Sequence, residues 1–259
     1  MRILFIGDVF GRPGRRAVRE CLPALIDKHA VDLTVVNAEN SAGGFGLTHD
    51  TVRELFDYGA DVLTGGNHSF DKREGLDVLE DNEMVLRPHN YPRENPGAGV
   101  AIVHRAGVRV AVLNLQGRVF MPLTDCPFQA ADRLLEELQD QADVVVMDLH
   151  AEATSEKLAM AWHLDGRAAA LVGTHTHVQT ADEQIFPEGL AYISDLGMCG
   201  PHRSILGVRR SQSLNRFLTG RSTRFETAKG DVRFHGALVE IDEATGRALT
   251  IERIQRRIN

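Results

Sequence analysis

The sequence predicts an α/β fold of four layers, in which two mixed β-sheets pack face to face and helices cover the outside. Short runs of Val, Ile and Leu recur through the first two-thirds of the 259 residues, and each is followed by a polar loop and often by a helical pattern. Strands that are buried on both faces and joined by helices form parallel sheets. Later apolar runs are joined by short turns, which add antiparallel strands. Because no repeat, low-complexity tract or linker interrupts the chain, we expect one domain spanning residues 1–259.

The first ninety residues predict three main strands and two helices. The strands are expected at Ile3–Ile6, Leu33–Val36 and Val62–Leu63, with a minor one at Val85. The first apolar run is short and lacks an Ala-x-Ala cleavage pattern, so it is interpreted as a strand and not as a signal sequence. One helix begins near Pro13, which a first helical turn tolerates, and another begins at Thr48 as its N-cap. Their inward faces are Val18, Leu22, Leu25 and Ile26 in the first, and Val52, Leu55 and Phe56 in the second.

The rest of the chain predicts a hairpin, two helices and further strands. Gly99–Val103 and Val108–Leu113 flank a short turn, which is typical of a hairpin. Helices are expected at Phe128–Leu138 and Thr154–Leu164, the second with Leu158, Ala161 and Trp162 on its apolar face. The remaining strands are expected at Val144–Leu149, Ala169–Val172, Ala191–Ser194, Phe234–Ile241 and Ala248–Ile254.

The composition is that of an ordinary globular protein and argues against two classes. Hydrophobic residues make up 43% of the chain, and the formal net charge is -7. That charge argues against a protein that coats long nucleic acid, because its affinity would rest on a basic face. No run of about 18 apolar residues is present, so we expect no membrane span. Cys21, Cys126 and Cys199 are widely spaced without a Cys-x-x-Cys motif, which favours a reducing compartment and therefore the cytoplasm.

The most informative feature is the set of polar residues that follows the strands. Five predicted strands end in a carboxylate, an amide or a histidine, and ligands of open α/β sheets bind at this edge. The residues are Asp8, Glu39, Asn40, Asn67, His150, His175 and His177. A single Asp or Asn after a strand is usually a turn residue or a helix cap, but turns do not explain five such ends in one chain.

This set of side chains predicts a dinuclear metal site. Carboxylate, amide and imidazole are together the donors of a first-row transition metal, and the set contains no thiolate. Seven donors are too many for one tetrahedral zinc ion, whereas two ions about 3.5–4 Å apart, bridged by a carboxylate, use them all. His175 and His177 alternate, so on an extended segment both would point to one side. Iron, manganese and zinc all accept these donors, so the residues alone do not choose among them.

The motifs at the strand ends resemble those of the calcineurin-like metallophosphoesterase superfamily, and within it the bacterial YmdB-like branch. The shared stretches are Gly7-Asp8, Asn37-Ala38-Glu39-Asn40, Gly66-Asn67-His68, His150 and Gly173-Thr174-His175-Thr176-His177, together with Gly11–Arg15, Asn40–Gly44 and Asp195–Pro201 of the branch. Two positions depart from the broad superfamily. Asp8-Val9-Phe10 lacks the usual Asp-x-His, and Glu39 stands where an aspartate is usual; both resemble the YmdB-like branch.

This resemblance implies a di-iron site that hydrolyses phosphodiesters, above all 2′,3′-cyclic nucleotides. It implies that one ion is bound by Asp8, Asn40 and His177. It implies that the other ion is bound by Asn67, His150 and His175, with Glu39 bridging the two. It also implies that His68 protonates the leaving group.

The chemistry expected of such a site is attack on phosphorus by a hydroxide that the two ions share, since metal binding lowers the pKa of water to about 7. His68 would donate a proton to the departing alkoxide, because imidazole titrates near neutrality. Two alternatives stay open for the neighbouring groups. His68 could instead hold a ligand by a hydrogen bond, and Asp71 could either orient His68 or cap the next helix. The Gly43–Gly46 loop lines the substrate mouth or is a plain turn.

Two other functions stay open. The same site can cleave phosphomonoesters, as a small-molecule or phosphoprotein phosphatase does. A regulatory protein could instead bind a nucleotide with little turnover. The expected partner is a small phosphoester, a nucleotide above all, with no long nucleic acid and no membrane. A homo-oligomer is compatible with the prevalence of symmetric assemblies among soluble proteins.

Overall fold

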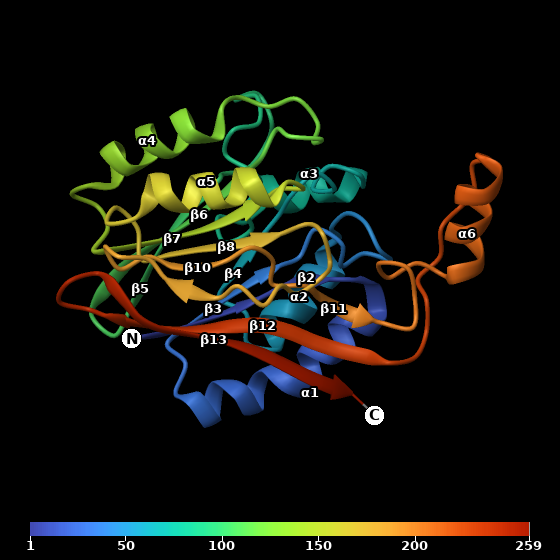
Figure 1. Cartoon of the computed structure of the whole chain (residues 1–259), viewed down its shortest axis with the longest axis horizontal. Coiled ribbons are helices and arrows are strands. Elements are labelled where there is room, and N and C mark those ends of the chain that lie inside the picture. Colours follow the sequence, from blue (N-terminus) through green and yellow to red (C-terminus); the bar gives the residue numbers. More distant parts are fainter. Residues whose placement is uncertain (259) are drawn as a thin grey trace.

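The computed structural model describes residues 1–258 and shows two mixed sheets stacked face to face between layers of helices (Figure 1). One sheet has seven strands and the other has six. The predicted α/β fold with two packed sheets and outer helices is confirmed.

The seven-stranded sheet is built around β1 (Arg2–Ile6). β1 pairs in parallel with β3 (Leu33–Asn37) and antiparallel with β12 (Val232–Asp242). β4 (Val62–Thr64) extends the parallel part beyond β3. β12 also pairs antiparallel with β11 (Met198–Pro201) and with the long β13 (Arg247–Ile258). β2 (Asp8–Val9) follows β1 closely in the chain but lies at the other side of β12, where it pairs in parallel with β11 at the edge of the sheet.

The six-stranded sheet begins with the predicted hairpin of β5 (Val100–Arg105) and β6 (Val108–Gln116). β7 (Val144–His150) and β8 (Ala170–Thr174) follow in parallel. β10 (Ala191–Ile193) is parallel to β8, and the short β9 (Gln184–Ile185) closes the edge antiparallel to it. The parallel part of each sheet therefore directs several strand ends to one edge.

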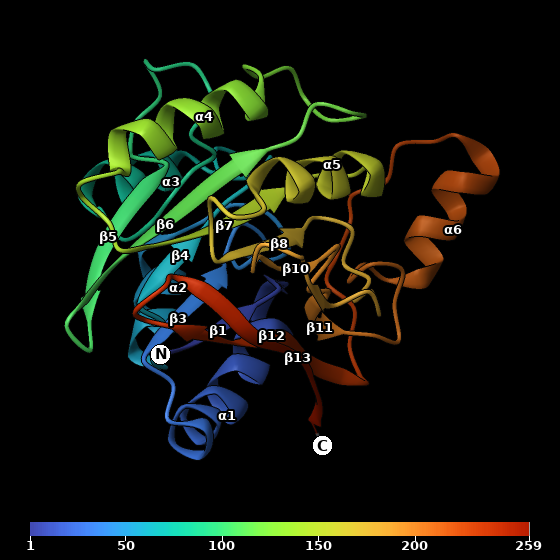
Figure 2. The same ribbon diagram turned by 60° about the vertical axis from the view of Figure 1, so that its left-hand side comes forward.

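Five of the six described helices cover the sheets. α1 (Gly11–His29), α2 (His49–Asp57) and α3 (Arg73–Asp81) pack against the seven-stranded sheet, and α4 (Pro127–Leu138) and α5 (Thr154–Leu164) against the six-stranded one. Thr48 caps α2 as predicted, because its side chain accepts the Thr51 N–H while the Thr51 hydroxyl accepts the Thr48 N–H. α6 (Arg210–Thr219) stands away from the body of the protein on an arm (Figures 1 and 2).

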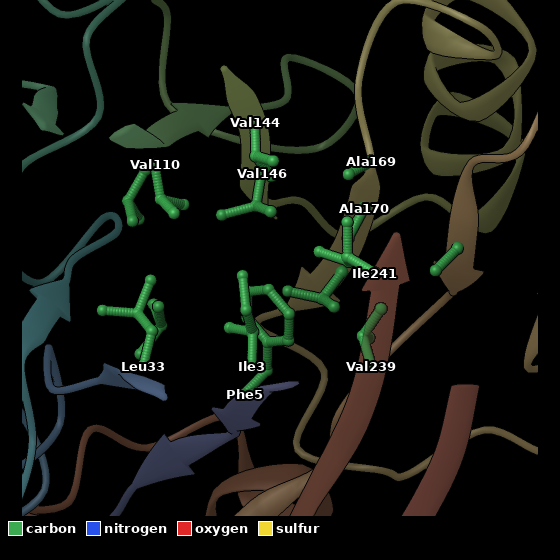
Figure 3. Packing of buried hydrophobic residues seen from close by; sticks show 14 of the residues in the cluster. Ile3, Phe5, Leu33, Val110, Val144, Val146, Ala169, Ala170, Val239 and Ile241 are labelled. Carbon is green, nitrogen blue, oxygen red and sulfur yellow. The ribbon is translucent and has the colours of Figure 1, made fainter. Parts of the chain in front are cut away.

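The core lies between the two sheets and on their outer faces. Figure 3 shows Ile3 and Phe5 of β1 pointing toward Val110 and Val146 of the facing sheet. Leu4, between them in the sequence, points the other way and packs with the cluster under α1, α2 and α3, because successive strand side chains alternate. A third cluster lies under α4 and α5. Burial on both faces is what the continuous apolar runs predicted.

The prediction for the apolar face of α5 was right for Ala161 and wrong for Leu158 and Trp162. Leu158 and Trp162 are 41% and 61% exposed, whereas Lys157 and Leu164 are buried. The side chains at positions 157, 160, 161 and 164 form the inward face, and Lys157 belongs to it because its ammonium has an acidic partner inside the protein. A charged residue on the buried face shifts the apparent hydrophobic period of the helix.

Other differences concern short or exposed elements. β2, β9 and β11 were not predicted, because two to four residues carry no period. α6 was also missed, and its apolar residues are largely exposed, whereas α3 is the helix that was expected after Asp71 without bounds. Cys21, Cys126 and Cys199 are free thiols, and among residues 1–258 no helix is both long and apolar enough to cross a membrane. The cytoplasmic location stays a prediction.

Candidate metal centre

All seven predicted metal ligands lie at strand ends, on both sheets. Asp8 follows β1 and opens β2; Glu39 and Asn40 follow β3; Asn67 follows β4; His150 ends β7; His175 and His177 follow β8. Hydrogen bonds join the two sheets at this edge. The Asn37 amide at the end of β3 donates to Asp148 of β7 and to Thr174 of β8. The structure therefore brings the five strand ends together.

One group of donors surrounds the Nε2 atom of His150. Asn67 Oδ1 lies 3.0 Å from this nitrogen, and Glu39 Oε1 and His175 Nδ1 each lie 3.1 Å from it. Glu39, His150 and His175 together offer one ligand atom each within 4.8 Å of one another. This group contains the three residues expected to bind one ion.

A second group surrounds the side-chain amide of Asn40. Its Nδ2 lies 3.3 Å from Asp8 Oδ1 and 3.3 Å from His177 Nε2. His177 Nε2 is 3.6 Å from Asp8 Oδ1. These are the three residues expected to bind the other ion. For Asn40 to serve as a ligand, its Oδ1 atom would have to face the metal, since an amide nitrogen is a donor of hydrogen bonds only.

Glu39 lies between the two groups. Its Oε1 atom is 3.1 Å from His150 Nε2 and 3.0 Å from Asn40 Nδ2. Its Oε2 atom accepts a 2.8 Å hydrogen bond from the backbone N–H of His68. Gly66 makes room for this arrangement, because a Cβ atom there would collide with the Glu39 carboxylate and the His150 ring. One carboxylate oxygen thus contacts both donor groups, as a bridging ligand would.

The buried carboxylates and imidazoles of the centre shift one another's pKa values, and the two carboxylates carry negative charge that attracts cations. Burial alone would raise the pKa of Glu39, but the charge and hydrogen bond of His150 lower it. Burial would likewise raise the pKa of Asp8, which His177 and His150 hold below its usual range. Burial opposes the charged form of His150, yet Glu39 and Asp8 raise its pKa to about 9. Burial and the nearby His150 lower the pKa of His175 to about 3, so that its lone pair stays available.

Hydrogen bonds around His150 determine which of its nitrogens faces the centre. Thr174 Oγ1 donates to Asp148 Oδ1 at 2.7 Å, so its single proton is used. The 2.9 Å contact between His150 Nδ1 and Thr174 Oγ1 therefore requires a proton on Nδ1. Because the pKa of His150 is about 9, Nε2 also carries a proton here, and a bound ion would replace that proton. Asp148 is fully buried, and burial raises its pKa to about 6 although Thr64, Thr174 and Asn37 donate to it.

The same reasoning applies to His175. Its Nε2 atom lies 3.1 Å from Glu152 Oε2, and a carboxylate only accepts, so Nε2 carries the proton. Nδ1 then directs its lone pair toward His150 Nε2, 3.1 Å away. Two carboxylates, Asp148 through Thr174 and Glu152 directly, thus orient the two rings. Such partners commonly set the tautomer of metal-bound histidines.

A buried ion pair supports the His-x-His loop from below. His175 and His177 have φ angles of 101° and 64°, which are uncommon for residues other than glycine. Lys157 Nζ donates to Thr174 O and to Asp195 Oδ2, both at 2.9 Å. Asp195 Oδ2 also accepts the N–H and hydroxyl of Thr176, at 3.0 and 2.8 Å. The residues on both sides of His175 are therefore anchored, which offsets the cost of its backbone conformation.

His68, the predicted acid, lies at the edge of the centre. Its Nδ1 atom is 2.7 Å from Asp71 Oδ2, and both side chains are partly exposed. Asp71 therefore orients His68, and the residue at the N-cap of α3 is Lys72.

The donor set fits a transition-metal pair. Two buried carboxylates, two amides and three imidazoles meet at one edge, and the set contains no sulfur. Sequence reasoning missed the supporting residues Asp148, Lys157 and Glu152. Asp148 could have been noticed, because it interrupts the apolar strand Val144–His150. Lys157 carries no such signal, since a lysine on a helix is usually solvated.

The comparison with known families covers nearly the whole chain. Residues 4–254 match the model of the family described as YmdB-like protein. The chain belongs to the YmdB-like family. The family that its strand-end motifs indicated is thereby confirmed.

Relatives of this YmdB-like chain are found among curated proteins and solved structures. A Bacillus subtilis (strain 168) protein named 2′,3′-cyclic-nucleotide 2′-phosphodiesterase is 49% identical over 254 residues, 98% of this chain and 96% of the relative. A Mycoplasma pneumoniae structure described as a novel phosphatase is 34% identical with a TM-score of 0.94, covering 99% of this chain and 93% of that one. A hypothetical protein from Thermus thermophilus is 44% identical with a TM-score of 0.94, covering 99% of both chains.

A more distant structure bears on the fold alone. The Thermus thermophilus 5′-nucleotidase precursor has 14% identity and a TM-score of 0.60, and this YmdB-like chain matches 54% of its length. The expected enzyme class, a hydrolase of phosphoric esters, agrees with the names of the closer relatives.

Proposed function

We propose that this protein hydrolyses phosphodiesters of small nucleotides, with 2′,3′-cyclic nucleotides as the leading substrate class, at a centre of two transition-metal ions. The observation that carries the proposal is the position of Glu39 Oε1, which contacts one donor group at His150 and the other at Asn40. The 49% identity to the Bacillus subtilis phosphodiesterase, over 98% of this chain, supports the substrate class.

In this proposal the residues keep the roles that the resemblance implied. Asp8, Asn40 and His177 hold one ion. Asn67, His150 and His175 hold the other, and Glu39 bridges them. Iron is the proposed metal on the basis of the family resemblance, while manganese and zinc suit the same imidazole and oxygen donors. When bound, two such ions supply a nucleophile from water at neutral pH and neutralise the charge of the phosphate.

His68 is proposed as the general acid. The Asp71 carboxylate accepts from Nδ1 at 2.7 Å, which orients the ring and leaves Nε2 for the leaving oxygen. The backbone N–H of His68 also donates to Glu39 Oε2, and this hydrogen bond fixes the position of the proposed acid relative to the bridging carboxylate. Imidazole suits this task because its pKa lies near the working pH of most enzymes.

A phosphomonoesterase is the second candidate, because the solved Mycoplasma pneumoniae relative is described as a phosphatase. The two activities are separated by comparing bis-p-nitrophenyl phosphate with p-nitrophenyl phosphate. We expect faster product release from the diester. A regulatory binding protein would bind cyclic nucleotide when loaded with metal and release no product over hours.

The decisive experiment measures metal content in protein purified without chelator. We expect about two transition-metal ions per chain, falling in Asn67→Ala and His150→Ala. His49→Ala is the matched control, because His49 is exposed at the start of α2 and is not among the proposed ligands. Absence of bound metal, with no gain on adding iron, manganese or zinc, would overturn the proposal.

A further inference from the structure

A cavity of about 360 Å³ opens beside the candidate centre and shares Asn40, His68 and His177 with it. Besides Phe10, its other walls come from two segments that are far apart in the sequence. One is the loop after β3, residues 43–45, and the other lies within residues 206–227, which include α6. Figures 1 and 2 show the second segment leaving the body of the protein as an arm. The volume of this cavity is at the lower end of the range for pockets that bind whole small ligands, so the cavity suits one part of a ligand.

The two walls are joined to each other and to the protein beneath. The Thr227 hydroxyl on the arm donates to Gly43 O at 3.1 Å. Gly44 has a φ of +112°, and a Cβ there would lie 2.9 Å from Phe10 Cζ, so the loop rests directly on the Phe10 ring. Phe10 in turn packs edge-on against His177, with ring centroids 5.6 Å apart. The cavity is therefore a continuation of the candidate centre.

The lining of the cavity is aromatic, with cations beside the rings. Phe45 is 42% exposed, and its ring centroid lies 6.4 Å from that of His68. Lys72 Nζ lies 5.2 Å from the Phe45 centroid, and the Arg216 guanidinium lies 5.3 Å from the centroid of Phe225. The acidic side chain of Glu226 also lines the cavity, but it pairs with Arg209 at 2.9 Å. Flat rings with positive charge nearby suit an aromatic ligand that carries a negative charge.

We propose that this cavity binds the base of a nucleotide whose phosphate lies at the metal centre, with Phe45 as the residue on which the base stacks. The inference rests on the proposed function and adds the part of the substrate that the protein recognises. A base is joined to its phosphate by one ribose, which matches a cavity directly beside the centre. Because every base has a π-face, stacking on Phe45 predicts little preference among the four bases.

The test compares two five-membered cyclic phosphates, 2′,3′-cyclic AMP and the base-free glycerol 1,2-cyclic phosphate. We expect Phe45→Ala to lower kcat/KM for 2′,3′-cyclic AMP about 10-fold, chiefly by raising KM, which is in the range of removing one base–aromatic stack. The loss with the base-free substrate should be under about twofold. Phe45→Tyr should restore the nucleotide KM. Phe217→Ala is the control, because Phe217 lies on α6, is 81% exposed and is not part of the cavity wall.

Each other outcome is informative. Equal losses with the two substrates would overturn the inference, since Phe45 would then act through His68 and not on a base. No loss with either substrate would also overturn it. If the wild-type protein hydrolyses neither, the proposed function fails, and equilibrium dialysis with 2′,3′-cyclic AMP then tests the cavity alone. Binding that Phe45→Ala weakens about 10-fold would support the base site, whereas unchanged binding would exclude it.

Discussion

The floor of the candidate centre and its rim are built in different ways. On the floor, Asp8, Glu39, His150 and Asp148 are almost fully buried, and each forms several hydrogen bonds or ion pairs. On the rim, Phe45 is exposed, and the residues around it come from loops and the α6 arm. A change in the floor leaves buried charge without a partner, whereas a rim side chain can be removed with little effect on the fold. The floor should therefore control metal binding and stability. The rim should control turnover and substrate choice.

The largest effect is expected from Glu39→Gln on the floor. The amide removes the charge that both donor groups share, while its size is nearly unchanged. We expect loss of both ions and a fall in phosphodiesterase activity of at least about 10⁴-fold, since the nucleophile and the charge neutralisation are lost together. Elemental analysis and rate measurements on the same sample would check this. Two ions retained at wild-type affinity would contradict the bridging role.

His68→Ala should reduce turnover without reducing metal binding, because His68 lies on the rim and not on the floor. The variant should keep its metal content and lose about 10²- to 10⁴-fold in kcat, the usual contribution of a general acid. Asp71→Asn should lose less, about 10-fold, because it only orients the ring. Both are measured with the same diester and with metal content determined in parallel. Full activity of His68→Ala would remove His68 from the mechanism.

Lys157→Met tests the support beneath the His-x-His loop. It leaves the buried Asp195 carboxylate without its cation, which typically costs about 3–5 kcal/mol of folding free energy. We also expect weaker metal binding, because Thr174 O and Thr176 lose part of their anchor. Denaturant unfolding and metal titration measure the two effects separately. Lys28→Met, exposed on α1, should change stability by less than about 0.5 kcal/mol.

A smaller, pH-dependent effect is expected from His235 on β12, whose backbone carbonyl accepts the N–H of Gly7 next to Asp8. Burial, with added repulsion from His202 and Arg233, lowers the pKa of His235 to about 3. The contribution of His235 to the free energy of unfolding is complete above the unfolded pKa of about 6.5. It is lost as pH falls toward 3, because only the unfolded chain gains the proton in this range. Between pH 7 and 5 the loss should be about 2 kcal/mol.

The measurement is the free energy of unfolding at pH 7 and pH 5 for the wild type and His235→Gln. The variant should be less sensitive to this pH change than the wild type, while His49→Gln, exposed on α2, should behave like the wild type. An equal pH dependence in all three proteins would show that His235 titrates normally.

Sequence reasoning was most successful where short-range pattern and parallel topology act together. The apolar runs predicted the strands, and the seven polar residues at their ends lie together as expected, since the ends of parallel strands share an edge. It did not predict that Lys157 is buried, and it placed Leu158 and Trp162 on the wrong face of α5. A lysine becomes a core residue only when an acid such as Asp195, 38 positions away, meets it inside the protein.

The chain's local patterns were sufficient to predict two sheets and outer helices and to select the donor residues of the candidate centre, because strand periodicity and side-chain chemistry are local properties. Three features depend on segments that are remote in the sequence. They are the position of Glu39 between the two donor groups, the ring orientations set by Asp148 and Glu152, and the cavity between Gly43 and the α6 arm. Their geometry follows from how the two sheets and the arm pack. No local pattern encodes those distances, because each contact joins residues whose separation along the chain carries no periodic signal.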